Sequence, residues 1–152
     1  MKQTVYIDMD NVLVDFDSGI ARLEAATKKA YEGKYDEVPG IFSLMDPLEG
    51  AIEAVHALAP YYELYVLSTA PWLNPSAWKD KVEWIQQYFG QEQDAILYKR
   101  LIISHHKDLN QGDYLIDDRT KNGAGNFKGE HIHFGTSKFP AWESVLAYLN
   151  PR

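Results

Sequence analysis

Two carboxylates, Asp8 and Asp10, come directly after a short apolar run, VYI at residues 5–7. A run rich in β-branched and aromatic residues is typical of a buried strand, and open α/β sheets bind ligands at the carboxyl ends of their strands. Two anions this close together repel each other, which is costly unless a cation or a shared proton relieves the repulsion. The stretch therefore predicts a metal site, an acid/base pair, or both.

Polar residues also follow the strands that the apolar runs at 62–67, 101–103 and 114–116 predict. In chain order these residues are Ser68, Thr69, Lys107, Asp117 and Asp118. Because helical patterns separate the strands, we expect a parallel sheet in which these groups meet at one edge. Three or four carboxylates at one edge need a hard cation, and Mg²⁺ prefers one or two carboxylates together with waters and phosphate oxygens.

These residue types favour phosphoryl transfer. Residues two apart in an extended strand point to the same side, so Asp8 and Asp10 can address one substrate atom. One carboxylate can attack phosphorus and form an aspartyl-phosphate, while the other protonates the leaving oxygen and then activates water. Ser68 can donate to the phosphoryl oxygens, and Lys107 can stabilise the negative charge that develops on them.

Helices that alternate with the strands predict an α/β fold. Helices are predicted at 46–58, 76–89 and 142–149, and a last strand at 131–134. The first helix should begin at Asp46 as N-cap, with Pro47 in the first position. The second should bury a stripe formed by Trp78, Val82, Ile85 and Phe89. We expect a Rossmann-like three-layer fold around a central parallel sheet, with residues 1–152 as a single domain.

The connection between the first two strands is unusually long. About 50 residues separate them, whereas a crossover connection needs only about 10–12. We therefore expect residues 16–46, approximately, to form a small helical cap inserted after the first strand and lying over the strand ends. The alternative is an ordinary crossover that contains two helices.

Composition excludes several classes of partner. The net charge is −7 and the pI is about 5.1, so there is no excess of Lys and Arg to neutralise a nucleic-acid polymer. The first residues reach two Asp before any long apolar stretch forms, and no run approaches the roughly 18 apolar residues of a membrane span. With no Cys in the chain, we expect a cytoplasmic protein without membrane association, either a monomer or a homodimer.

The combined motifs resemble a known superfamily. DMDNV at 8–12, the YVLST strand end, a loop Lys and LIDDR at 115–119 are similar to the four motifs of the haloacid dehalogenase (HAD) phosphohydrolases. More closely, DMDNVLVDF, LMDPLEGAIEAV, LSTAPW and LIDDR resemble the 5'(3')-deoxyribonucleotidases. The resemblance runs from the N-terminus to about Arg119, and beyond that only the pattern of strand and helix matches.

The resemblance assigns catalytic roles to individual positions. It implies that Asp8 is the nucleophile and that Asp10 is the acid/base, with its main-chain carbonyl on the metal. It also implies that Lys107 neutralises the intermediate, although Lys99 and Lys121 also lie near strand ends. Superfamily members that form a stable ester usually lack the second acid, so Asp10 favours phosphatase or phosphomutase chemistry. Mutases generally carry a larger cap than this chain can contain, so hydrolysis is the expected reaction.

The resemblance also implies a phosphate site and a Mg²⁺ site. Ser68 and Thr69 would hold the phosphate. Asp8 and Asp118 would bind Mg²⁺ directly, and Asp117 would act through water or orient its neighbours. The superfamily commonly has Gly where this chain has Asn11, a residue that tolerates unusual backbone angles better than most.

Three aromatic side chains could stack on a nucleobase, namely Phe16, Phe42 and Trp72. Stacking of a base on an aromatic ring contributes about 1–3 kcal/mol. A role in packing the core or the cap is an equal alternative for each ring. His131 and His133 face one side of a strand, but a third ligand is not evident, so a metal pair is disfavoured.

The resulting prediction is a magnesium-dependent phosphatase of (deoxy)nucleoside monophosphates. A phosphatase for another small monoester, such as a sugar phosphate, is the alternative. A phosphorylatable receiver domain also uses strand-end Asp, Ser or Thr, and Lys. Its acidic pair comes first in the chain, however, whereas here the pair Asp117 and Asp118 follows Lys107. A binding module without activity is disfavoured, because no expected catalytic position is missing.

Overall fold

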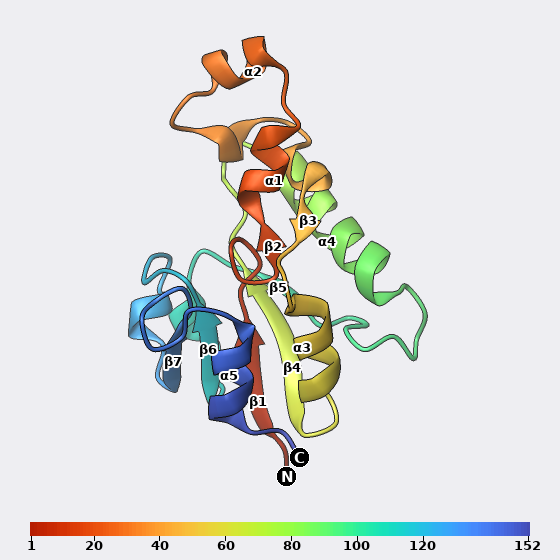
Figure 1. The fold of residues 1–152 in the computed structure, drawn as a ribbon, viewed down its shortest axis with the longest axis vertical. Helices are drawn as coiled ribbons and strands as arrows, with labels where there is room; N and C mark the ends of the chain where they lie inside the picture. Colours follow the sequence, from red (N-terminus) through yellow and green to blue (C-terminus); the bar gives the residue numbers. More distant parts are fainter.

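The computed structural model describes residues 1–152, and a five-stranded sheet forms its centre (Figure 1). The strands are β1 (Gln3–Ile7), β4 (Tyr62–Ser68), β5 (Leu101–Ile103), β6 (Tyr114–Asp117) and β7 (Glu130–His133). All neighbouring strands are parallel, in the order β5-β4-β1-β6-β7, which confirms the predicted α/β fold class. The order reverses direction at β1, and open α/β sheets bind ligands at such switch points.

Side chains of β1 alternate between the two faces of the sheet. The helices and 3-10 helices that follow in the chain are α3 (Ala51–Leu58), α4 (Ser76–Phe89), η3 (Lys107–Leu109), η4 (Ala124–Asn126) and α5 (Trp142–Leu149). Val5 and Ile7 join a core of 29 buried residues to which α3, α4 and α5 contribute. Tyr6 points the other way, into a cluster with Ala124 and Phe127. Helices therefore cover one face, while short 3-10 helices and loops cover the other. None of the helices combines the length and apolar character that crossing a membrane requires.

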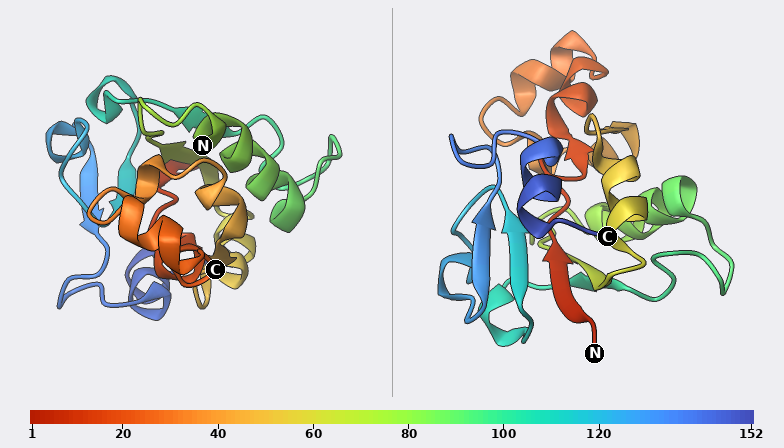
Figure 2. Two further views of the ribbon diagram at one scale, coloured as in Figure 1. Left: turned by 90° about the horizontal axis from the view of Figure 1, so that it is seen from above. Right: turned by 60° about the horizontal axis from the view of Figure 1, so that its bottom comes forward.

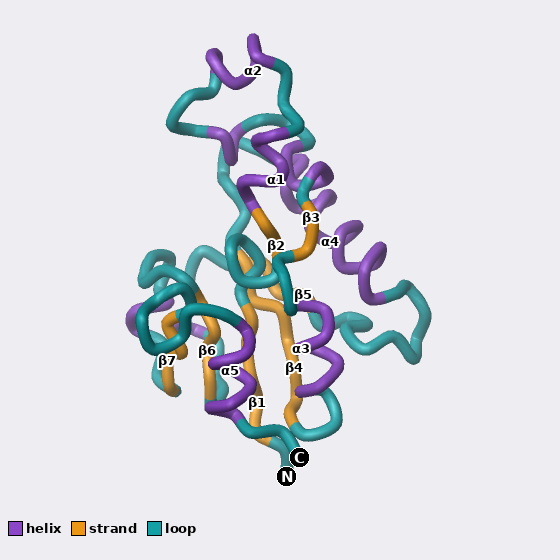
Figure 3. The backbone as a smooth tube through the Cα atoms, in the orientation of Figure 1, coloured by secondary structure: helices purple, strands orange, loops and turns teal.

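A helical segment is inserted between β1 and β4. Its elements are β2 (Val14–Asp15), α1 (Phe16–Ala21), α2 (Ala25–Ala30), η1 (Tyr35–Glu37), η2 (Ile41–Leu44) and β3 (Asp46–Pro47). The antiparallel pair of β2 and β3 connects this segment to the sheet (Figure 3). The segment stands beyond the carboxyl ends of the strands, and seen from above it lies over the sheet (Figure 2). Both chain termini lie at the opposite end of the molecule (Figure 1).

The helix α3 begins at Ala51 rather than at Asp46. Asp46 and Pro47 instead form β3, and the side chain of Asp46 accepts a hydrogen bond from Arg22 at 2.7 Å. Proline is tolerated at the edge of such a small sheet, because its missing N–H is not needed there. Gly50, with a φ of 81°, then turns the chain into the helix. Pairing with β2 thus outweighs the local helix-start signal.

Leu58 lies in α3 and is fully buried, so its side chain should contribute to the stability of the fold. Replacing Leu58 with Ala removes buried methyl groups and leaves a cavity, so the free energy of unfolding should fall by about 2–5 kcal/mol. Chemical denaturation followed by circular dichroism measures the change. The same substitution at Leu109, which is 76% exposed, should change stability by less than about 0.5 kcal/mol. Equal effects at both sites would contradict the assigned core.

Candidate active site

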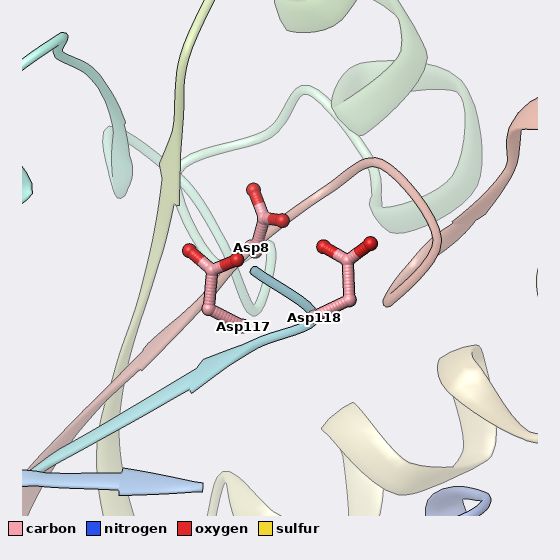
Figure 4. Close-up of side chains that lie close together, drawn as sticks. All are labelled: Asp8, Asp117 and Asp118. Carbon is pink, nitrogen blue, oxygen red and sulfur yellow. The ribbon is translucent and has the colours of Figure 1, made fainter. Parts of the chain in front are cut away.

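The strand register brings the predicted acidic residues together at one edge of the sheet. Ile7 of β1 is paired with Ile116 of β6, so Asp8 and Asp117 follow side by side. Figure 4 shows the side chains of Asp8, Asp117 and Asp118 pointing to the same side from the ends of these two strands. Asp8 and Asp117 are buried, with exposed fractions of 6% and 2%. Residues more than 100 positions apart in the chain thus form one cluster.

This cluster has the properties of a cation site. One carboxylate oxygen from each of Asp8, Asp117 and Asp118 lies within 4.8 Å of the others. Oδ1 of Asp118 is buried and has no hydrogen-bond partner. Burial, together with the negative charges of Asp8 and Asp117, raises the pKa of Asp118 to about 7. A hard divalent cation such as Mg²⁺ would relieve this repulsion and supply the missing partner, so the donor set fits the metal.

Lys107 provides a positive charge on the other side of the cluster. Its Nζ atom donates to Oδ1 of Asp8 at 3.0 Å and to Oδ2 of Asp117 at 2.6 Å. Burial lowers the pKa of Lys107, but the charges of Asp8 and Asp117 outweigh this effect and the pKa lies above its ordinary value. The other two lysines that the sequence offered, Lys99 and Lys121, are exposed. Lys107 is therefore the one of the three that contacts the candidate nucleophile.

Asp10 lies in a tight turn just beyond β1. The N–H groups of Val12, Leu13 and Val14 all donate to the carbonyl of Met9. Trp142 fastens the turn from α5, because its Nε1 donates to the Val12 carbonyl at 2.8 Å. This arrangement holds Asp10 at a fixed position above the strand end.

Asn11 occupies a special backbone conformation in the same turn. Its φ is 62°, in the left-handed region that Gly adopts freely and that Asn tolerates better than most other residues. The geometry gives a physical reason for Asn at a position where the superfamily commonly has Gly.

The structure adds Lys81 to the site, a residue that the sequence analysis did not identify. Lys81 lies on α4 and is fully buried. Its Nζ donates to Ser68 Oγ at 2.6 Å, to the Thr69 carbonyl at 2.8 Å and to Asp10 Oδ2 at 3.3 Å. Burial and the charge of Asp8 raise the pKa of Asp10, while Lys81 opposes the shift. Lys81 therefore connects the candidate acid/base to the candidate phosphate site.

The helical pattern of α4 contained a signal for Lys81. Val82, which was expected in the buried stripe, is 40% exposed. The buried face instead includes Ala77, Lys81, Trp84 and Ile85. A lysine in the middle of a buried stripe is rarely found without a polar partner, so this position indicated a buried anion or hydroxyl near α4.

A cavity of about 540 Å³ opens beside the acidic cluster. It is lined by Asp10, Asn11, Phe16, Gly33, Tyr35, Asp36, Thr69, Pro71, Asp118, Arg119 and Asn122. The wall thus combines residues of the strand ends with residues of the inserted segment. Its volume lies within the roughly 300–1,000 Å³ that is usual for small-molecule sites.

The three candidate stacking rings differ in their access to this cavity. Phe16 forms part of the wall. Phe42 is 2% exposed and packs edge-to-face against Phe16. The Nζ atom of Lys81 lies 4.6 Å from the centre of the Phe42 ring. Trp72 is 78% exposed but does not line the cavity, and it packs against Trp78 and His105. Of these three rings, Phe16 is therefore the one that a ligand in the cavity can contact.

Asn74 fixes the inserted segment to the loop after β4. Its side-chain Nδ2 donates to the carbonyls of Asp36 and Val38 at 2.9 and 3.0 Å, and Oδ1 accepts a hydrogen bond from Ser76. Asn74 is 2% exposed, so every polar atom of its side chain is satisfied inside the protein. The Asp36 side of the cavity is thereby held in place relative to Thr69 and Pro71.

Comparison with known proteins identifies the family. A family model described as "5' nucleotidase, deoxy (Pyrimidine), cytosolic type C protein" matches residues 26–144. A Vibrio phage KVP40 protein named "Putative 5'(3')-deoxyribonucleotidase" is 61% identical over 148 residues, which cover 97% of this chain and 85% of the relative. The chain belongs to the 5'(3')-deoxyribonucleotidase family. A more distant relative, the human cytosolic-type 5'(3')-deoxyribonucleotidase, is 26% identical over 171 residues, covering 93% of this chain and 78% of the human protein.

Solved structures of HAD hydrolases share the fold of this deoxyribonucleotidase-family chain. The structure described as the "putative HAD-hydrolase YfnB from Bacillus subtilis bound to magnesium" superposes with a TM-score of 0.64 at 13% identity, covering 98% of this chain and 99% of that chain. A haloacid dehalogenase-like hydrolase from Xanthomonas campestris gives a TM-score of 0.60 at 11% identity, covering 98% and 91%. At these identities the likeness concerns the fold alone, and it confirms the HAD-like architecture.

The contacts of Lys81 predict a change in the acidity of Asp10. Replacing Lys81 with Met keeps the aliphatic bulk but removes the ammonium group that lowers the pKa of Asp10, so this pKa should rise further. NMR titration of the side-chain carboxyl carbons measures it. Lys79→Met is the matched control, because Lys79 lies on the same helix but pairs with Glu83. An unchanged pKa of Asp10 in Lys81→Met would contradict the assigned contact.

Proposed function

We propose that this protein is a magnesium-dependent phosphatase that hydrolyses (deoxy)nucleoside monophosphates through an aspartyl-phosphate intermediate. The observation that carries the proposal is the buried arrangement of Asp8 between Lys107 and Asp118, with Asp10 two residues further on. Membership of the 5'(3')-deoxyribonucleotidase family supports the same reaction and points to nucleotides as the substrate class.

In the proposed reaction, a carboxylate oxygen of Asp8 attacks phosphorus, and the bond from phosphorus to the ester oxygen breaks. Asp10 donates a proton to the leaving alcohol, which its raised pKa favours. Asp10 then takes a proton from water, and the water attacks the aspartyl-phosphate and releases phosphate and free Asp8. The two carboxylates therefore have separate tasks, one as nucleophile and the other as acid and base.

The surrounding residues stabilise charge during these steps. Lys107 pairs with Asp8 and would face the phosphoryl oxygens. Ser68 would donate to them from its hydroxyl. Thr69 would donate from its main-chain N–H, because its own hydroxyl already donates to the Ser104 carbonyl. Asp8, Asp118 and the main-chain carbonyl of Asp10 would hold Mg²⁺, with Asp117 acting through water or orienting its neighbours. The bound Mg²⁺ would neutralise negative charge on the transferring phosphoryl group.

The cavity suits the rest of a nucleotide. Phe16 offers an aromatic face for the base, and Tyr35 and Asp36 provide polar groups on the inserted segment. The net charge of −7 favours a small phosphate monoester over a nucleic-acid polymer. We infer a cytoplasmic location, in line with the "cytosolic type" name of the human relative.

A panel of phosphate monoesters tests this proposal. Phosphate release should be faster from deoxynucleoside and ribonucleoside monophosphates than from 2-deoxyribose 5-phosphate, which keeps the sugar and phosphate but lacks the base. Each substrate is assayed with Mg²⁺ and with a chelator, and activity should depend on Mg²⁺. Equal or faster release from sugar phosphates would favour a sugar-phosphate phosphatase instead. Absence of release from every monoester would remove the phosphatase assignment.

Replacing Asp8 with Asn tests the nucleophile. The amide is nearly the same size but cannot attack phosphorus, so kcat should fall by more than about 10³-fold while the circular dichroism spectrum stays unchanged. Asp17→Asn is the matched control, because Asp17 is exposed on α1, and it should retain the activity of the parent protein. Substantial residual turnover in Asp8→Asn would exclude Asp8 as the nucleophile.

A further inference from the structure

Two histidines on the edge strand β7 contact the main chain of the acidic pair. His131 and His133 alternate along the strand and face the same side, with ring centres 4.9 Å apart and planes inclined by 21°. Nε2 of His131 lies 3.0 Å from the carbonyl oxygen of Asp117, and Nε2 of His133 lies 3.0 Å from that of Asp118. Both nitrogens must carry a proton to donate to these oxygens. The rings are thus occupied with protein carbonyls and are not arranged as metal ligands.

The contact of His133 is the more consequential of the two. The Asp117 carbonyl also accepts the N–H of Phe134 at 3.0 Å, as part of the sheet ladder. Asp118 lies one residue beyond the end of β6, where the ladder no longer holds it. The hydrogen bond from His133 is the single one that the main-chain N–H and C=O groups of Asp118 make.

The side chain of Asp118 needs such support. One of its oxygens is buried without a partner, and the charges of Asp8 and Asp117 repel it. The direction in which the carboxylate points depends on the main chain that carries it. The bond from His133 fixes the carbonyl group of Asp118, and with it the following peptide plane. The stacked ring of His131 limits the freedom of the His133 ring.

We propose that His133 is a positioning residue that holds Asp118 in the orientation required to bind Mg²⁺, with His131 supporting the His133 ring. The inference rests on the proposed function, in which Asp118 is a Mg²⁺ ligand. Hydrogen-bond partners of metal ligands typically change metal affinity or activity by about 10–100-fold when they are removed. His133 acts one bond further out than usual, through the main chain of the ligand rather than through its carboxylate.

Three substitutions of His133 separate the hydrogen bond from the bulk of the ring. In His133→Gln the amide nitrogen takes a position close to that of Nε2, so the bond to Asp118 can form. In His133→Asn the amide lies near the position of Nδ1, which is too short to reach, and in His133→Leu no donor remains. His56→Asn is the matched control, because His56 is exposed on α3, away from the cluster.

The test is isothermal titration of each purified, metal-free protein with Mg²⁺ alone. The dissociation constant should rise about 10-fold in His133→Asn and His133→Leu, and stay within about twofold of the parent in His133→Gln and His56→Asn. At low Mg²⁺, His133→Asn and His133→Leu should lose turnover because they bind Mg²⁺ more weakly. This turnover should return at saturating Mg²⁺, which a general loss of structure would not allow. If His133→Leu does not fold, the dissociation constants of His133→Asn and His133→Gln are compared instead, and they test the role of the hydrogen bond.

Two results would overturn the inference. One is an unchanged dissociation constant in the folded Asn and Leu variants. The other is a dissociation constant for Mg²⁺ that rises as much in His133→Gln as in His133→Asn, because the hydrogen-bond donor at position 133 would then have no effect. Failure of the parent protein itself to bind Mg²⁺ is a different result: it would remove the magnesium site of the proposed function, and the role of His133 with it.

Discussion

The structure of the site depends on the repulsion between three neighbouring carboxylates, those of the buried Asp8 and Asp117 and of the half-buried Asp118. Their oxygens lie within 4.8 Å of one another, where like charges in a poorly solvated site are costly. Lys107 offsets part of this cost by contacting two of the three. The remaining carboxylate, Asp118, forms no ion pair, and burial together with the charges of Asp8 and Asp117 raises its pKa. The protein thus accepts an unfavourable cluster that a divalent cation would stabilise.

The sheet makes this cluster rigid. β1 lies between β4 and β6, so its end is flanked on both sides by strand ends that carry polar residues. Beyond the strands, Asp10 has no ladder partners and is held instead by a turn that Trp142 fastens from α5. Asp118 is held by His133 in a similar way. Hydrogen bonds from side chains of other elements therefore hold the two carboxylate residues that lie beyond the regular sheet.

A second cation, Lys81, links two parts of the molecule. Its ammonium group reaches Ser68 and Asp10 at the strand ends, and its outer side packs against Phe42 of the inserted segment. Burying a lysine is costly unless it is fully paired, and here three oxygens and an aromatic ring surround it. The inserted segment therefore does more than cover the cavity, because it also shields the ion pair that adjusts the acidity of Asp10.

The sequence by itself determined the parallel sheet and the clustering of Asp8, Asp117 and Asp118. Strand ends of a parallel sheet share one edge, so local patterns were sufficient to bring distant residues together. Only the tertiary structure decided the partners of Lys81 and His133 and the burial of Phe42. These depend on how α4, β7 and the inserted segment pack on the sheet, and side-chain periodicity does not specify that packing. The start of α3 was decided in the same way, because strand pairing of Asp46 outweighed its local capping signal.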